Sequence, residues 1–144
     1  MTTRMDADRW ALFMLRLLFG GLFVYHGFMK VVTALHGRGL GGFAQSLQSI
    51  GFFPGLFWAW AVTIVEFVGG IFIFVGFATR IAALAITIEM IVAGLKVNLA
   101  RGFLWTRGGL EVPLIFAVIG IIFVLTGPSF PSVDHAAGWE QGRT

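Results

Sequence analysis

Four long runs of apolar residues constrain this chain more than any other feature. They cover about residues 10–32, 56–77, 81–97 and 110–127, and runs of ~17 to 23 residues match a hydrocarbon core of ~30 Å at 1.5 Å rise per residue. Only 12% of the chain is charged, against about 25% in soluble domains, so a soluble fold of this size has no means of burying the apolar surface. We therefore predict an all-α integral membrane protein, a four-transmembrane-helix bundle that forms one domain over residues 1–144.

The connections between these runs add a short helix and a tight hairpin. Apolar residues recur at helical spacing in the first loop: Leu40, Phe43, Leu47 and Ile50. This pattern predicts a short interfacial helix that lies at the membrane surface or dips into the bundle. Residues 78–80 alone separate the second run from the third, so these two helices must be antiparallel. The tail over residues 128–144 is polar, and we expect it to be mobile.

The arginine distribution bears on orientation. An even number of crossings puts both termini on one side, with Arg4, Arg9, Arg80 and Arg143 there and Arg38, Arg101 and Arg107 on the other. The excess of positive charge on cytoplasmic loops predicts cytoplasmic termini. Counting Lys30 and Lys96 as loop residues would reverse this balance.

Composition excludes several kinds of chemistry. The chain has no cysteine, so thiol redox chemistry, disulfides and thiolate-bound metals are not open to it. A haem held by two histidines is not expected either, since His26 is the one histidine within a predicted helix. Di-iron sites need Glu-x-x-His pairs, which are missing, and the scattered basic residues do not indicate nucleic-acid binding.

Ionisable residues within the apolar runs are the strongest functional signal. There are six: Arg16, Lys30, Lys96, Glu66, Glu89 and Glu111. Each costs at least ~2.5 to 3.5 kcal/mol at mid-membrane, so such residues normally face the bundle interior and find partners. The three positive and three negative charges are expected to neutralise one another between helices.

Helix direction predicts where these residues gather. His26, Lys30, Lys96, Asn98 and Glu111 lie toward the side with the two long loops, while Glu66 and Glu89 lie nearer the middle. We expect one polar pocket there that suits a quinone head group or another small polar molecule. Its candidate residues are Arg16, His26, Lys30, Glu66, Glu89, Lys96, Asn98 and Glu111, with Arg101, Trp105 and Arg107 at the rim and the short first-loop helix as a lid.

A purely structural explanation stands beside each of these residues. Arg16, Glu66 and Glu89 can fix helix register as charge pairs, and Lys30 and Lys96 can extend their ammonium groups to the interface. Glu111 can simply complement a helix dipole. A single helix histidine such as His26 is more often a packing residue than a ligand.

Four segments together resemble the DoxX family of small bacterial membrane proteins. They are RLLFG leading into YHGFMK (16–30), EFVGG followed by GFATR (66–80), GFLWTRGGLE (102–111) and LTGPSFPSVD (125–134). The family's characteristic positions fall here on Arg16, His26, Gly27, Lys30, Glu66, Gly69, Gly70, Arg80, Glu111 and Asp134. Asn98 departs from the pattern, because such proteins often have histidine there, which removes a titrating group but keeps a hydrogen-bonding one.

The resemblance implies a location and a range of functions. Members are associated with thiosulfate:quinone oxidoreductase, with quinone or catechol detoxification and with oxidative-stress complexes. We therefore expect a multi-pass protein of the bacterial inner (plasma) membrane that binds a quinone or similar redox-active molecule and serves a soluble or membrane oxidoreductase, alone or as a homo-oligomer. Two alternatives remain: a small-solute or proton-coupled transporter, and a non-catalytic anchor for a soluble enzyme.

Overall fold

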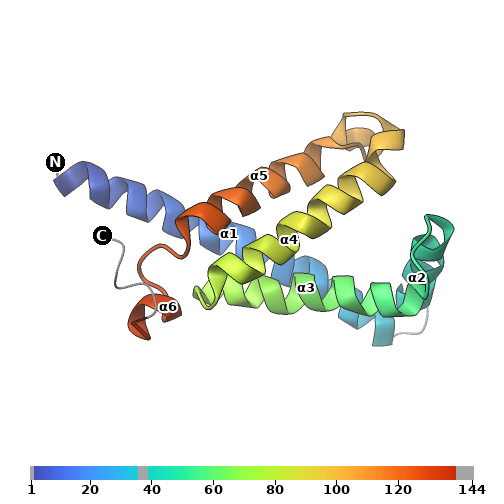
Figure 1. Cartoon of the computed structure of the whole chain (residues 1–144), viewed down its shortest axis with the longest axis horizontal. Coiled ribbons are helices and arrows are strands. Elements are labelled where there is room, and N and C mark those ends of the chain that lie inside the picture. The colour runs from blue at the N-terminus through green and yellow to red at the C-terminus, as the bar shows by residue number, and fades with distance from the viewer. Residues whose placement is uncertain (1, 36–38, 139–144) are drawn as a thin grey trace.

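The computed structural model describes residues 2–35 and 39–138, which form helices and loops without strands. The α-helices are α1 (Thr2–Leu35), α2 (Gly39–Ser49), α3 (Gly55–Val75), α4 (Thr79–Ala93), α5 (Glu111–Thr126) and α6 (Val133–Ala136). A π-helical turn, η1 (Gly94–Asn98), and two 3₁₀ turns, η2 (Leu99–Arg101) and η3 (Trp105–Arg107), lie between α4 and α5. Figure 1 shows α3 and α4 diverging from their short turn, with α5 beside α4 and α2 at the far end of α3.

Three helical segments are long and apolar enough to cross a membrane. They are Ala7–Thr33, Gly55–Val75 and Thr79–Arg101. The fourth predicted run forms α5, which is apolar but has 16 residues and so rises about 24 Å, less than a ~30 Å hydrocarbon core. The all-α, membrane-spanning class is therefore confirmed, and the fourth helix is shorter than the other three.

Direct contact between the backbones of α1 and α3 organises one half of the molecule. A Cβ atom added to Gly27 would lie 2.5 Å from Phe67 Cα, and one added to Gly20 would lie 2.6 Å from the Phe74 nitrogen. Gly70 on α3 meets α1 equally closely, at 2.6 Å from the Val24 nitrogen. In lipid, where burial of apolar surface does not drive helices together, such close approach is how small residues favour association.

Buried aromatic and aliphatic side chains connect this helix pair to α4 and α5. Phe19 and Phe23 of α1, Ile73 of α3, Ile86 of α4 and Phe123 of α5 are each at most 2% exposed and belong to one cluster. Phe19 packs edge-on to Phe23 at 5.0 Å between ring centroids and stacks with Phe123 at 5.8 Å. The core therefore lies where α1 crosses the other helices, away from the divergent ends of α3 and α4.

The short first-loop helix was predicted correctly, whereas the end of α4 was not. Helix α2 is present, and it buries Leu40, Ala44 and Leu47. The run predicted as a regular helix over 81–97 instead changes to a π-helical turn at Gly94. A Cβ atom added at Gly94 would lie 2.8 Å from Leu110 Cδ1, so glycine at this position lets the turn pack against the residue before α5.

The expectation of a mobile tail is wrong for residues 129–138. Arg16, which is 2% exposed, donates hydrogen bonds to the carbonyl oxygens of Ser129 at 2.6 Å and Pro131 at 2.5 Å. Asp134 accepts from the backbone nitrogens of Ala78 at 2.8 Å and Thr79 at 3.2 Å. The carboxylate thereby satisfies free N–H groups at the start of α4, which a polar composition alone does not reveal. Residues 139–144 of the predicted tail lie outside the described residues.

Arg80 ties the end of α5 to the start of α4. Its guanidinium donates to the carbonyl oxygens of Val124 at 2.7 Å, Leu125 at 2.8 Å and Thr126 at 3.1 Å. These are carbonyls of the last helical turn, which have no partner within the helix. Arg80 and Asp134 together make the α3–α4 turn the fixed end of the molecule.

A glycine pair tests the α1–α3 contact. Gly27→Ala should lower the free energy of unfolding by about 2 to 3 kcal/mol, because the added methyl group meets the Phe67 backbone and overpacking costs on this order. Gly41→Ala on α2 is the control, since its added Cβ meets nothing within 4 Å and alanine is the better helix former. Unfolding in mixed detergent micelles, followed by circular dichroism, measures both. Equal stabilities of the two variants would contradict the contact.

Candidate ligand-binding site

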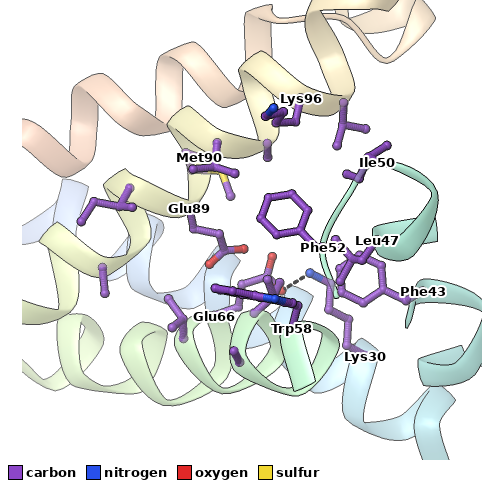
Figure 2. Close-up of a pocket in the computed structure, with 18 of the residues that line it drawn as sticks. Lys30, Phe43, Leu47, Ile50, Phe52, Trp58, Glu66, Glu89, Met90 and Lys96 are labelled. Carbon is purple, nitrogen blue, oxygen red and sulfur yellow. Dashed lines mark ion pairs between the residues drawn. The ribbon is translucent and has the colours of Figure 1, made fainter. Parts of the chain in front are cut away.

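A cavity of about 530 Å³ occupies the space between α3 and α4 on the side of α2. Figure 2 shows α4 above it, α3 below it, and the loop that follows α2 beside it. Its polar lining residues are Lys30, Glu66, Glu89, Lys96 and Asn98. The remaining lining residues are apolar or aromatic, and include Phe43, Leu47, Ile50, Phe52, Trp58 and Met90.

An ion pair between α1 and α3 forms the charged centre of the cavity. Lys30 Nζ lies 2.5 Å from Glu66 Oε2, with side-chain exposures of 29% and 7% respectively. Lys30 Nζ also lies 4.9 Å from the centroid of the Phe43 ring, within the range of a cation–π interaction. The close α1–α3 contact at Gly27, one turn before Lys30, sets this pair in place.

Glu89 brings a second carboxyl group to the same centre from the opposite wall. In Figure 2 its side chain reaches from α4 toward Glu66. Glu66 Oε2 is buried and bonded to Lys30, whereas Glu89 Oε2 is buried and has no hydrogen-bond partner among the described residues. Two carboxyl groups thus share one ammonium group, and the centre carries an excess negative charge unless a proton or a ligand group balances it.

Aromatic side chains form the wall nearest α2. Phe52 and Trp58 pack edge to face with ring centroids 5.4 Å apart, and the Trp58 indole N–H donates to the Phe53 carbonyl oxygen at 3.4 Å. Phe43 lies on α2 and Ile50 follows that helix. The amphipathic pattern of 40–50 predicted the helix that contributes to this wall. Phe52 and Trp58 were missed, because the sequence placed them in a loop and at a helix start.

The structure separates the sequence-predicted candidates into two groups. Lys30, Glu66, Glu89, Lys96 and Asn98 line the cavity. Arg16, His26, Glu111 and the expected rim residues Arg101, Trp105 and Arg107 do not line it. A single cavity bounded by His26, Lys30, Glu66 and Glu111 was therefore wrong for His26 and Glu111.

Each excluded residue has a local explanation. Arg16 binds the tail, and His26 is exposed on α1, with its ring 6.0 Å from that of Tyr25. The Glu111 carboxylate accepts a hydrogen bond from the Trp105 backbone nitrogen at 2.9 Å, so it holds the loop before α5. Lys30–Glu66 is the one ion pair within the described ranges, because Arg16 and Glu111 bond to backbone groups rather than to opposite charges.

The π-helical turn η1 positions the cavity-lining residues that follow α4. Lys96, Val97 and Asn98 lie on η1 and line the cavity. The Asn98 amide donates to the carbonyl oxygens of Gly108 at 2.7 Å and Gly109 at 3.3 Å, and so connects this turn to the loop before α5. π-Helical turns within longer helices often lie at functional sites.

Apolar helices long enough to span a bilayer, around a cavity with a charged centre, define a multi-pass membrane protein with an internal cavity. The DoxX family model matches residues 11–99, and the chain therefore belongs to the DoxX family. This match contains two of the four segments that carried the resemblance and all the cavity-lining residues.

One relative extends the similarity beyond that range. The chain is 31% identical over 121 residues to a Bacillus subtilis (strain 168) protein named "Putative oxidoreductase CatD", an alignment that covers 84% of this chain and 82% of the relative. No solved structure gives a significant match. The family and this relative link the chain to oxidoreduction in membranes.

A double-mutant cycle tests the charged centre. Lys30→Met and Glu66→Gln should show a coupling free energy of about 1 to 3 kcal/mol, because each change removes the partner of the other in a mostly buried pair. Lys96→Met with Glu66→Gln is the matched control, with coupling below about 0.5 kcal/mol, since additivity holds where no partner is shared. Unfolding in mixed micelles measures the free energy of unfolding of the parent, the two single variants and the double variant in each cycle. Equal coupling in both cycles would show that Lys30 and Glu66 act independently.

Proposed function

We propose that this protein binds a quinone or a similar small redox-active ring in the cavity between α3 and α4 and serves a membrane-associated oxidoreductase. The observation that carries the proposal is the combination of an aromatic wall with a paired-carboxyl centre inside one apolar cavity. The name of the Bacillus subtilis relative supports the oxidoreductase part.

The size and lining of the cavity suit a planar ring. Its volume of about 530 Å³ falls within the ~300–1,000 Å³ of small-molecule sites, which are mostly apolar with a few polar groups that orient the ligand. Phe52 and Trp58 offer ring faces and edges on one side, and Met90 and Ile88 of α4 line the other. Aromatic contacts of this kind add about 0.5 to 1.5 kcal/mol beyond simple burial.

The charged centre suits the polar end of such a ring. A quinone interconverts with its quinol by exchange of two electrons and two protons. Glu66 and Glu89 can hold or release protons at their buried carboxyl oxygens, and Lys30 fixes Glu66 in place. The electrons are exchanged with an oxidoreductase partner, which is the reason for proposing such a partner.

For the membrane arrangement, we propose that α5 is a fourth crossing and that both termini are cytoplasmic in a bacterial inner membrane. The packing of α5 along α4 supports this arrangement (Figure 1). Its N-terminal Glu111 and the polar groups at Thr126 mark the two ends of an apolar segment. Local thinning of the bilayer accommodates a short helix at modest cost.

A pair of tryptophan variants tests ligand binding. Trp58→Phe should weaken binding of a short-chain ubiquinone analogue about three- to tenfold, in line with the loss of part of an aromatic contact. Trp60→Phe is the matched control, because Trp60 lies on the same helix, is 45% exposed and does not line the cavity. Calorimetric titration of the full chain in lipid nanodiscs measures both affinities. Undetectable binding to the parent chain, or equal weakening by both variants, would contradict the proposal and favour the anchor alternative.

Reporter fusions test the arrangement in the membrane. A fusion after Thr106, which follows α4, and a fusion after Thr144 should report opposite sides, because α5 lies between them. We expect alkaline phosphatase to be active after Thr106 and inactive after Thr144, with fluorescent-protein fusions giving the reverse pattern. The same side for both positions would show that α5 does not cross.

A further inference from the structure

We propose that the cavity binds the reduced, dihydroxy form of its ring ligand in preference to the oxidised, dicarbonyl form. The inference rests on the proposed function, since it assumes that a redox-active ring binds between α3 and α4. It is carried by the balance of hydrogen-bond donors and acceptors at the cavity wall.

The carboxyl acceptors of the cavity lie at its centre, and one of their oxygens lacks a partner. Glu89 Oε2 is buried without a hydrogen bond from any described residue, and Figure 2 shows the Glu89 carboxyl group reaching into the space opposite Glu66. An unpaired buried acceptor destabilises a structure, so a ligand that donates a hydrogen bond there is favoured. Glu66 Oε2 is paired with Lys30, which leaves Glu89 Oε2 as the available acceptor.

The side-chain donors of the cavity are mostly engaged elsewhere. The described lining residues with N–H donors are Lys30, Trp58, Lys96 and Asn98. The Lys30 ammonium group is paired with Glu66 and faces the Phe43 ring, Trp58 donates to the Phe53 carbonyl, and Asn98 donates to the carbonyls of Gly108 and Gly109. Lys96 is an exposed residue of the π-helical turn. The centre therefore has an unpartnered acceptor at Glu89, while its side-chain donors already have contacts of their own.

The two redox forms of a ring ligand differ in their ability to donate a hydrogen bond to this centre. A quinol carries two O–H donors, whereas a quinone carries only carbonyl acceptors, which a carboxylate oxygen repels. Even if one proton is shared between Glu66 and Glu89, the two groups present four oxygens against one O–H. A site built to accept a hydrogen bond discriminates strongly against an analogue that lacks the donor.

Binding of a matched redox pair to the full chain in nanodiscs tests the inference. We expect 2-methyl-1,4-naphthoquinol, titrated without oxygen, to bind at least about tenfold more tightly than 2-methyl-1,4-naphthoquinone, the factor given by one hydrogen bond to a charged acceptor. For a two-electron couple, a tenfold preference raises the reduction potential of the bound pair by about 30 mV.

The Glu89→Gln variant tests whether the quinol preference comes from the Glu89 carboxyl group rather than from the overall polarity of the cavity. The amide replaces one acceptor by a donor at nearly constant shape, so the preference should fall to about two- to threefold or reverse. Glu111→Gln is the control that keeps the full preference, because its side chain contacts the Trp105 backbone outside the cavity.

The unmodified chain alone can overturn the inference. Equal affinities, or tighter binding of the quinone, would refute the preference and leave the proposed ring site standing. Failure of both forms to bind would refute the proposed function together with the inference. An unchanged preference in Glu89→Gln would refute the role of this carboxyl group.

Discussion

The contact between α1 and α3 is the constraint on which the rest of the arrangement depends. Glycine on both helices lets the two backbones meet, and this brings Lys30, near the end of α1, within 2.5 Å of Glu66, in the middle of α3. The Glu66 charge at that depth is tolerated because the helix that carries its partner is held close by backbone packing. The same glycines therefore determine both the fold and the charged centre.

The opposite ends of the molecule are held in contrasting ways. At the α3–α4 turn, Arg16, Arg80 and Asp134 bind backbone groups of the tail, of α5 and of α4. At the other end, α3 and α4 diverge and the space between them is lined by the aromatic residues of α2 and its loop. Side-chain hydrogen bonds to backbone groups hold one end together, and the other end encloses the cavity. This arrangement is expected of a rigid scaffold that carries a candidate binding site at its open end.

Much of the fold followed from the length and spacing of apolar runs, because these are local properties of the chain. The first-loop helix, the α3–α4 hairpin and the inward position of Glu66 were predicted correctly for that reason. The role of Asp134 was not predicted, since a cap formed 55 residues from its partner leaves no periodic signal. His26 and Glu111 were misplaced because depth along a helix is readable from sequence, whereas the direction of a side chain around it depends on packing.

The sequence shows equal numbers of positive and negative residues within the apolar runs, but this balance did not predict which of them form ion pairs. Three positive and three negative residues suggested three ion pairs, yet within the described ranges only Lys30 and Glu66 form one. Arg16 and Glu111 use backbone partners, which sequence composition cannot distinguish from charged ones. Glu89 is consequently left beside an already neutralised pair. That surplus carboxyl group, rather than any complete set of pairs, is what makes the cavity a candidate for ligand or proton binding.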